Sequence, residues 1–92
     1  MTDVVARRLV VSGRVQGVNF RWWVVQQARA RGLSGWAANQ ADGSVEVWLQ
    51  GEAGAVAAVE RLVGEGPPHA RVAAVKARGE SPRADLDGFS RR

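Results

Sequence analysis

Residues 44–50 alternate between apolar and polar side chains, which is typical of a strand with one buried face. The apolar positions are Val45, Val47 and Leu49. Residues 7–13 form a β-branched run that closes on a glycine, and this composition also predicts a strand. Two segments of the chain should therefore place one apolar face against a common core.

Two longer segments repeat their apolar residues at the spacing of a helix. In residues 20–31 and again in residues 52–63, these positions recur every three or four residues, which predicts two amphipathic helices. They are Phe20, Trp23, Val24 and Ala28 in the first segment, and Val56, Val59, Leu62 and Val63 in the second. Each helix should cover part of the apolar face of the sheet.

Two weaker strands complete the pattern, at residues 33–39 and 70–78, and residues 89–92 could add a short fifth strand at an edge. The resulting order, β-α-β-β-α-β, predicts an α+β fold of the ferredoxin-like type. We expect a four-stranded antiparallel sheet with both helices on one face, because each crossover is right-handed. The expected organisation is a single domain over residues 1–92.

This topology predicts which polar residues meet at one edge of the sheet. The first two strands should run in the same direction on either side of the third, so that their ends meet at one edge of the sheet, about 10 Å apart. The loop of residues 13–21 would then face Asn39, which ends the second strand before an Asp-Gly turn. Read alone, Asn39 would be an ordinary hairpin-entry residue.

The loop of residues 13–21 leads from a strand directly into a helix, an arrangement that favours anion binding. Gly17 lets the chain curl so that successive amides point inward. Arg21 falls in the first helical turn, where a cation opposes the helix dipole and a bound phosphate would offset that cost. The loop matches neither common nucleotide-binding glycine motif, so nucleotide-binding folds gain no support. An ordinary turn before a helix remains the alternative.

Composition excludes several other chemistries. The 92 residues include no cysteine and one histidine, which rules out thiol nucleophiles, disulfide scaffolds, iron–sulfur clusters and histidine-rich metal sites. No apolar run approaches the ~18 residues of a membrane helix, and the first ten residues lack a signal-peptide core, so we expect a cytoplasmic protein. The net charge of +4, with twelve arginines, is compatible with a nucleic acid or a small anion as partner, but most of the dispersed arginines are expected to be solvated surface residues.

The motifs of the loop and of the second strand together resemble the acylphosphatase family. The resemblance rests on Gly13-x-Val15-Gln16-Gly17-Val18-x-Phe20-Arg21, Gly32-Leu33-x-Gly35-Trp36-x-x-Asn39, Asp42-Gly43-x-Val45, Gln50-Gly51 and Gly66-Pro67. It spans about residues 9–72, with all spacings in register, and its first two motifs are highly specific.

The resemblance implies a ferredoxin-like enzyme that hydrolyses the carboxyl–phosphate bond of acyl phosphates. By the match, Arg21 binds the phosphate, the amides of Val15, Gln16, Gly17, Val18, Asn19 and Phe20 form a cradle around it, and Asn39 positions the attacking water. The family implies neither metal nor other cofactor and no covalent intermediate. The expected partners are a small acyl phosphate and inorganic phosphate, as product and inhibitor. We expect no nucleic-acid or membrane partner, and a monomer.

Two positions depart from the family pattern, and two further residues have expected roles outside it. Ala37 stands where the family usually has valine, and Gln40 where it often has threonine, so a hydroxyl that could orient Asn39 is missing. His69 should be an exposed turn residue, not a base. Arg14 could steer anions toward the loop.

The four tryptophans divide into two pairs. We expect Trp23 and Trp36 in the core, and Trp22 and Trp48 partly exposed, with Trp48 on the sheet face without helices.

Three alternatives remain at this point. RNA-recognition modules share the element order and a basic charge, but they stack bases on aromatic side chains of their two central strands, and here only Trp48 qualifies. A non-catalytic, anion-binding relative is the second alternative. A domain cut from a larger maturation protein is the third.

Overall fold

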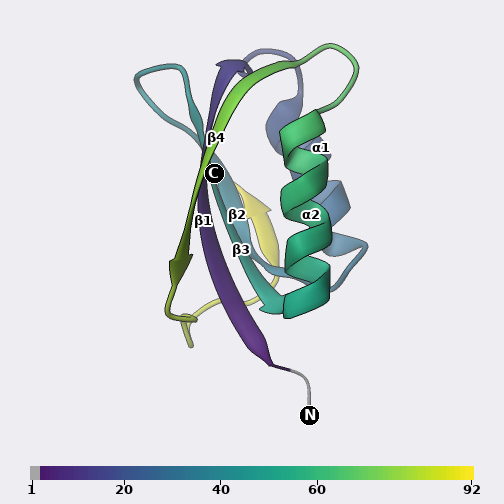
Figure 1. Ribbon diagram of the computed structural model, residues 1–92, viewed down its shortest axis with the longest axis vertical. Coiled ribbons are helices and arrows are strands. Elements are labelled where there is room, and N and C mark those ends of the chain that lie inside the picture. The colour runs from purple at the N-terminus through teal and green to yellow at the C-terminus, as the bar shows by residue number, and fades with distance from the viewer. Residues whose placement is uncertain (1–2) are drawn as a thin grey trace.

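The computed structural model describes residues 3–92 and contains one mixed sheet with two helices. The strands are β1 (Val4–Arg14), β2 (Ser34–Asn39), β3 (Val45–Glu52), β4 (Arg71–Glu80) and β5 (Phe89–Arg91), and the helices are α1 (Phe20–Arg29) and α2 (Ala53–Glu65). Both helices lie on the same face of the sheet (Figure 1). The ferredoxin-like α+β prediction is confirmed.

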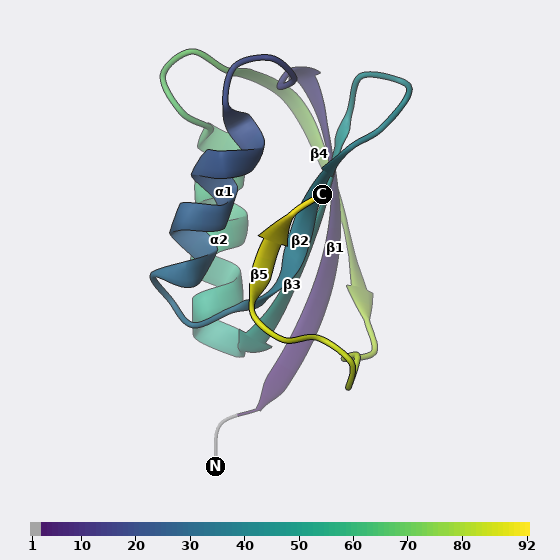
Figure 2. The ribbon, with the colours of Figure 1, turned by 180° about the vertical axis from the view of Figure 1, so that it is seen from behind.

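The strand order is β4-β1-β3-β2-β5. The β1–β3, β1–β4 and β2–β3 pairs are antiparallel, as predicted, whereas β5 adds a parallel edge beside β2. β1 and β2 therefore flank β3 and run in the same direction. Their final residues reach the same end of the sheet, where the loop into α1 and the β2–β3 hairpin also lie (Figures 1 and 2).

The main core lies between the sheet and the helices and follows the two sequence periodicities. Alternate residues of β1 and β3 point into it, among them Leu9, Val11 and the three apolar positions predicted in β3, all fully buried. The helices contribute Phe20, Val24, Val25 and Ala28 from α1, and Val56, Val59 and Val63 from α2. Burying these side chains is the main term that stabilises the fold.

The helix-free face carries a second, smaller cluster. Trp36 and Trp48 stack with ring centroids 5.1 Å apart and an interplanar angle of 14°. Trp36 is buried as predicted, but it lies in this cluster and not beneath the helices. The prediction that Trp48 is partly exposed is wrong, since its exposed fraction is 7%. Trp22 is exposed, as predicted, whereas Trp23, expected in the core, is half-buried and packs against it.

The chain between β4 and β5 explains why Trp48 is buried. It crosses the helix-free face on its way to the opposite edge (Figure 2). Gln50 fixes this segment at Arg83, because its side chain donates to the carbonyl of Arg83 at 2.8 Å and accepts from its amide at 2.9 Å. The guanidinium of Arg83 lies 5.3 Å from the ring centroid of Trp36. The sequence pattern of β3 alone could not reveal that the segment between β4 and β5 covers Trp48.

Glu46 joins this cluster to β1. Its carboxylate accepts hydrogen bonds from Trp36 Nε1 at 2.9 Å and from Arg8 Nε at 2.6 Å. Burial raises the pKa of Glu46, but these hydrogen bonds and the charge of Arg8 outweigh burial, so the pKa lies below its usual value. The charged carboxylate is therefore the stable form in the folded protein.

A substitution at Gly35 tests how closely β2 packs against β3. Its φ is +140°, and a Cβ at this position would lie 1.8 Å from the backbone oxygen of Trp48. We expect Gly35→Ala to lower the free energy of unfolding by about 2–5 kcal/mol, because it adds both backbone strain and overpacking. Urea denaturation measures this value. Gly64→Ala in α2 is the control: its Cβ meets nothing within 4 Å, so a gain of about 0.5–1 kcal/mol is expected. A neutral Gly35→Ala would contradict the interpretation.

Candidate functional site

A small cavity of about 140 Å³ lies at the end of the sheet where β1 and β2 terminate. Its size suits a compact anion, since sites for drug-sized ligands measure about 300–1,000 Å³. It is lined by Val15, Gly17, Asn19, Phe20, Arg21, Trp22, Asn39 and Arg91. The predicted loop, Arg21 and Asn39 thus meet in one place.

The loop between β1 and α1 is held at both ends and curled between them. Val15 and Phe20 are each 1% exposed and anchor it in the core. Gly17 (φ +74°) and Asn19 (φ +63°) adopt the left-handed conformation, which turns the chain sharply. Asn19 does not cap the helix with its side chain, and the first turn of α1 contains no acidic residue. The positive end of the helix therefore faces the cavity without a carboxylate of its own turn.

Arg21 is half-buried at the start of α1, and a distant part of the chain holds it. Its Nη1 donates to the main-chain oxygen of Arg92 at 2.6 Å. Arg92 is itself fixed twice, because its amide donates to the carbonyl of Ala37 at 2.8 Å and its guanidinium lies 4.2 Å from the ring centroid of Trp36. The direction of the Arg21 side chain therefore depends on the segment that follows β5.

Asn39 is the last residue of β2 and lies opposite Val45 in the register with β3. Its side chain is exposed. The hairpin that follows is closed by a hydrogen bond of 2.8 Å from the amide of Gln40 to the carbonyl of Ser44. The Asp42 carboxylate accepts from the hydroxyl and the amide of Ser44, and these bonds hold the pKa of Asp42 below its usual value. The hairpin thus presents Asn39 from a closed, hydrogen-bonded turn.

Two predicted cradle residues do not line the cavity. Val18 packs half-buried against the main core, and the Gln16 side chain turns toward the β2–β3 hairpin. Sequence reasoning missed Trp22 and Arg91 as lining residues. The position of Trp22 in the first turn of the helix could have indicated it. Arg91 reaches the cavity because the short edge strand β5, which the sequence allowed, pairs with β2, and no local pattern indicates that partner.

The other two candidate residues lie outside the cavity. Arg14 is exposed and stands directly opposite Arg71 in the β1–β4 register. Two like charges at opposed positions repel each other, so they raise the positive potential at this end of the sheet. His69 is exposed in the turn after α2, as predicted.

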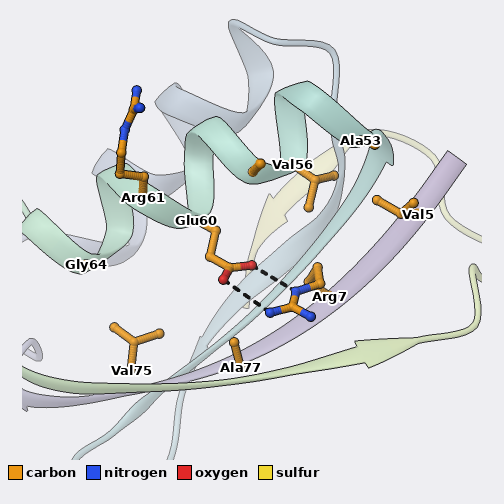
Figure 3. A pocket seen from close by; sticks show the side chains of 10 residues that line it. Val5, Arg7, Ala53, Val56, Glu60, Arg61, Gly64, Val75 and Ala77 are labelled. Carbon is orange, nitrogen blue, oxygen red and sulfur yellow. Dashed lines mark hydrogen bonds and ion pairs between the residues drawn. The ribbon is translucent and has the colours of Figure 1, made fainter. Parts of the chain in front are cut away.

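A larger groove of about 480 Å³ lies between α2, β1 and β4 and shares no lining residue with the smaller cavity (Figure 3). Small apolar side chains form most of its wall. Its charged groups are Arg7 and Glu60, which pair through two hydrogen bonds of 2.9 and 3.2 Å, and Arg61, which points away. The hydrogen bond and the charge of Glu60 raise the pKa of Arg7. With this pair mutually satisfied, the groove offers little chemistry for catalysis.

Within residues 3–92, no three His, Cys, Asp or Glu side chains cluster closely enough to hold a metal ion. Over the same residues, no helix is long and apolar enough to cross a membrane. The polar groups at the cavity include the guanidinium of Arg21, the neutral side-chain amide of Asn39 and the positive end of α1. Together these groups can bind a tetrahedral oxyanion and place a neutral donor and acceptor beside it.

Comparison with known proteins gives a consistent result. The acylphosphatase family model matches residues 7–91. An acylphosphatase of Anaeromyxobacter dehalogenans is 46% identical over 89 residues, which are 97% of this chain and 96% of the relative. The crystal structure of the Bacillus subtilis acylphosphatase superposes with a TM-score of 0.91 at 33% identity, covering 96% of this chain and 98% of that one.

A larger protein contains a similar unit. The structure of full-length HypF in its phosphate- and nucleotide-bound form aligns with a TM-score of 0.89 at 25% identity, over all of this chain but only 12% of HypF. The relatives that match along nearly their whole length are thus named acylphosphatases, and the family model agrees with them. By sequence and by fold, this chain belongs to the acylphosphatase family.

Proposed function

We propose that Arg21, Asn39 and the loop of residues 15–20 carry out the hydrolysis of acyl phosphates by direct attack of water on phosphorus. The reaction, cleavage of a carboxyl–phosphate bond to a carboxylate and inorganic phosphate, is that of the acylphosphatase family. The observation that carries the proposal is the convergence of Arg21 and Asn39, eighteen positions apart, on one small cavity at a helix N-terminus.

Arg21 binds and polarises the phosphoryl group in this mechanism. Its guanidinium matches two phosphate oxygens, and the loop amides add donors from the opposite side. Phosphoryl transfer spreads charge over three equatorial oxygens, so fixed donors stabilise the transition state without rearranging. The contact between Arg21 and the main-chain oxygen of Arg92 supports this role, because it holds the long side chain at the cavity before substrate arrives.

Asn39 orients the nucleophile. Its amide oxygen accepts from a water molecule, and its NH₂ can donate toward the anion. A bond forms between the water oxygen and phosphorus, while the bond from phosphorus to the acyl oxygen breaks and its electron pair leaves with the carboxylate. A phosphate oxygen of the substrate takes the proton of the water, so neither a basic side chain nor a metal ion is required.

A nucleic-acid-binding function is disfavoured by the helix-free face. Modules that stack bases need exposed aromatic rings on their central strands. Here Trp36 and Trp48 are 5% and 7% exposed. They stack on each other, and Arg83 lies over both rings. We further propose a single acylphosphatase-like domain acting as a cytoplasmic monomer, inhibited by its product phosphate, with no nucleic-acid or membrane partner.

The kinetics of two variants test the mechanism. With benzoyl phosphate and EDTA present, we expect Arg21→Ala to lower kcat/KM about 100–1,000-fold, as for the loss of a transition-state donor. Asn39→Ala should lower kcat more than it weakens phosphate inhibition, because it removes the water and not the anion site. Near-wild-type turnover by either variant would refute its assigned role. If the unmodified protein releases no phosphate, it is an anion-binding relative without catalysis.

Thermal unfolding with inorganic phosphate tests the anion site independently of turnover. A ligand that binds only the folded state adds about 2.7 kcal/mol at a concentration of 100 Kd. We expect phosphate to raise the Tm of the wild type and of Arg61→Ala, which removes an exposed arginine from α2, but not that of Arg21→Ala. An equal rise in all three proteins would place phosphate elsewhere.

A further inference from the structure

The Gln16 side chain connects the loop after β1 to the hairpin after β2. Its Nε2 donates to the carbonyl of Gln40 at 2.8 Å and to the carbonyl of Ser44 at 2.9 Å. These are the two main-chain groups at the neck of the hairpin, where the amide of Gln40 also donates to Ser44. One carboxamide therefore binds both sides of the turn from a segment 24 residues away.

The identity of the donor follows from its partners. Carbonyl oxygens can only accept hydrogen bonds, so the group between them must be the NH₂ of Gln16 and not its oxygen. Both protons of that NH₂ are used. The side chain is half-buried, and Ser44 is 5% exposed, so these bonds lie partly out of competition with water.

Gln40 directly follows Asn39, so Gln16 holds the peptide next to the residue proposed to orient water. The sequence had indicated a missing hydroxyl at position 40. In the folded chain, Gln40 Oε1 lies 2.8 Å from the Ser44 hydroxyl, whose single proton it shares with Asp42 Oδ1 at 2.6 Å, and this contact joins the two sides of the hairpin. Neither contact touches the phosphate cavity, whose lining includes Asn39 but not Gln16 or Gln40.

We infer that Gln16 is a positioning residue for Asn39: by clamping the neck of the β2–β3 hairpin to the phosphate loop, its side chain sets the distance between bound phosphate and attacking water. The inference rests on the proposed function, since it assigns Gln16 a role through Asn39. It goes beyond the loop's expected contribution of main-chain amides, because the side chain acts away from the phosphate. A small displacement of a reacting group costs much of the rate.

Gln16→Met tests the inference, because methionine has similar length but cannot donate. We expect kcat for benzoyl phosphate to fall about 10–100-fold, with the inhibition constant of inorganic phosphate changed less than about threefold, since the cradle keeps its amides. Gln26→Met, at an exposed glutamine of α1, is the matched control and should retain wild-type kcat. Gln16→Asn, one methylene shorter, keeps the polar group but cannot span both carbonyls, and provides the same test if the methionine variant does not fold.

A double-mutant cycle with Asn39→Ala separates positioning from a general structural effect. If Gln16 acts through Asn39, adding Gln16→Met to Asn39→Ala lowers kcat by less than about twofold further, because the positioned group is already gone. Three outcomes would each overturn the inference. The kcat losses of the two single variants could multiply in the double variant, kcat could be unchanged in Gln16→Met, or Gln16→Met could lower kcat and phosphate affinity in parallel. If Asn39→Ala itself leaves kcat unchanged, the proposed mechanism fails first, and the role of Gln16 fails with it.

Discussion

The antiparallel pairing of β1 and β2 to the two sides of β3 is the constraint on which the rest of the structure depends. Because both strands pair with the same neighbour, they must run in the same direction and end at the same end of the sheet. The loop that carries Arg21 and the hairpin that presents Asn39 begin where these strands end. Burial of the apolar residues of β3 fixes this register, since a shift by one residue would expose the entire core face.

The site combines a strongly held framework with a few polar contacts that set its geometry. Val15 and Phe20 anchor the loop between β1 and α1 in the core, and the left-handed conformations of Gly17 and Asn19 bend the chain between them. Gln16 ties this loop to the hairpin, and Arg92 ties Arg21 to the far edge of the sheet. The hydrophobic core thus sets the approximate positions of the loop and the hairpin, and hydrogen bonds between distant segments fix the geometry of the site.

The charged side chains near the site differ from those elsewhere on β1. An arginine in the first turn of a helix opposes the helix dipole, and no acidic residue of that turn compensates it. Arg14 and Arg71 add two opposed cations at the same end of the sheet. In contrast, Arg7 and Arg8 are each neutralised by a carboxylate. Arg14, Arg21 and Arg71 thus place positive charge at the end of the sheet where an anion is proposed to bind.

Local pattern was sufficient for the element order, the ferredoxin-like topology and the meeting of Arg21 with Asn39. Each of these depends on periodicity and on strand direction, which short segments encode. The tertiary structure decided the burial of Trp48 beneath residues 81–88, the parallel pairing of β5, and the contacts of Gln16 and Arg92. These features join segments far apart in sequence, so whether they form depends on the packing of the whole chain. A local sequence pattern therefore cannot predict them.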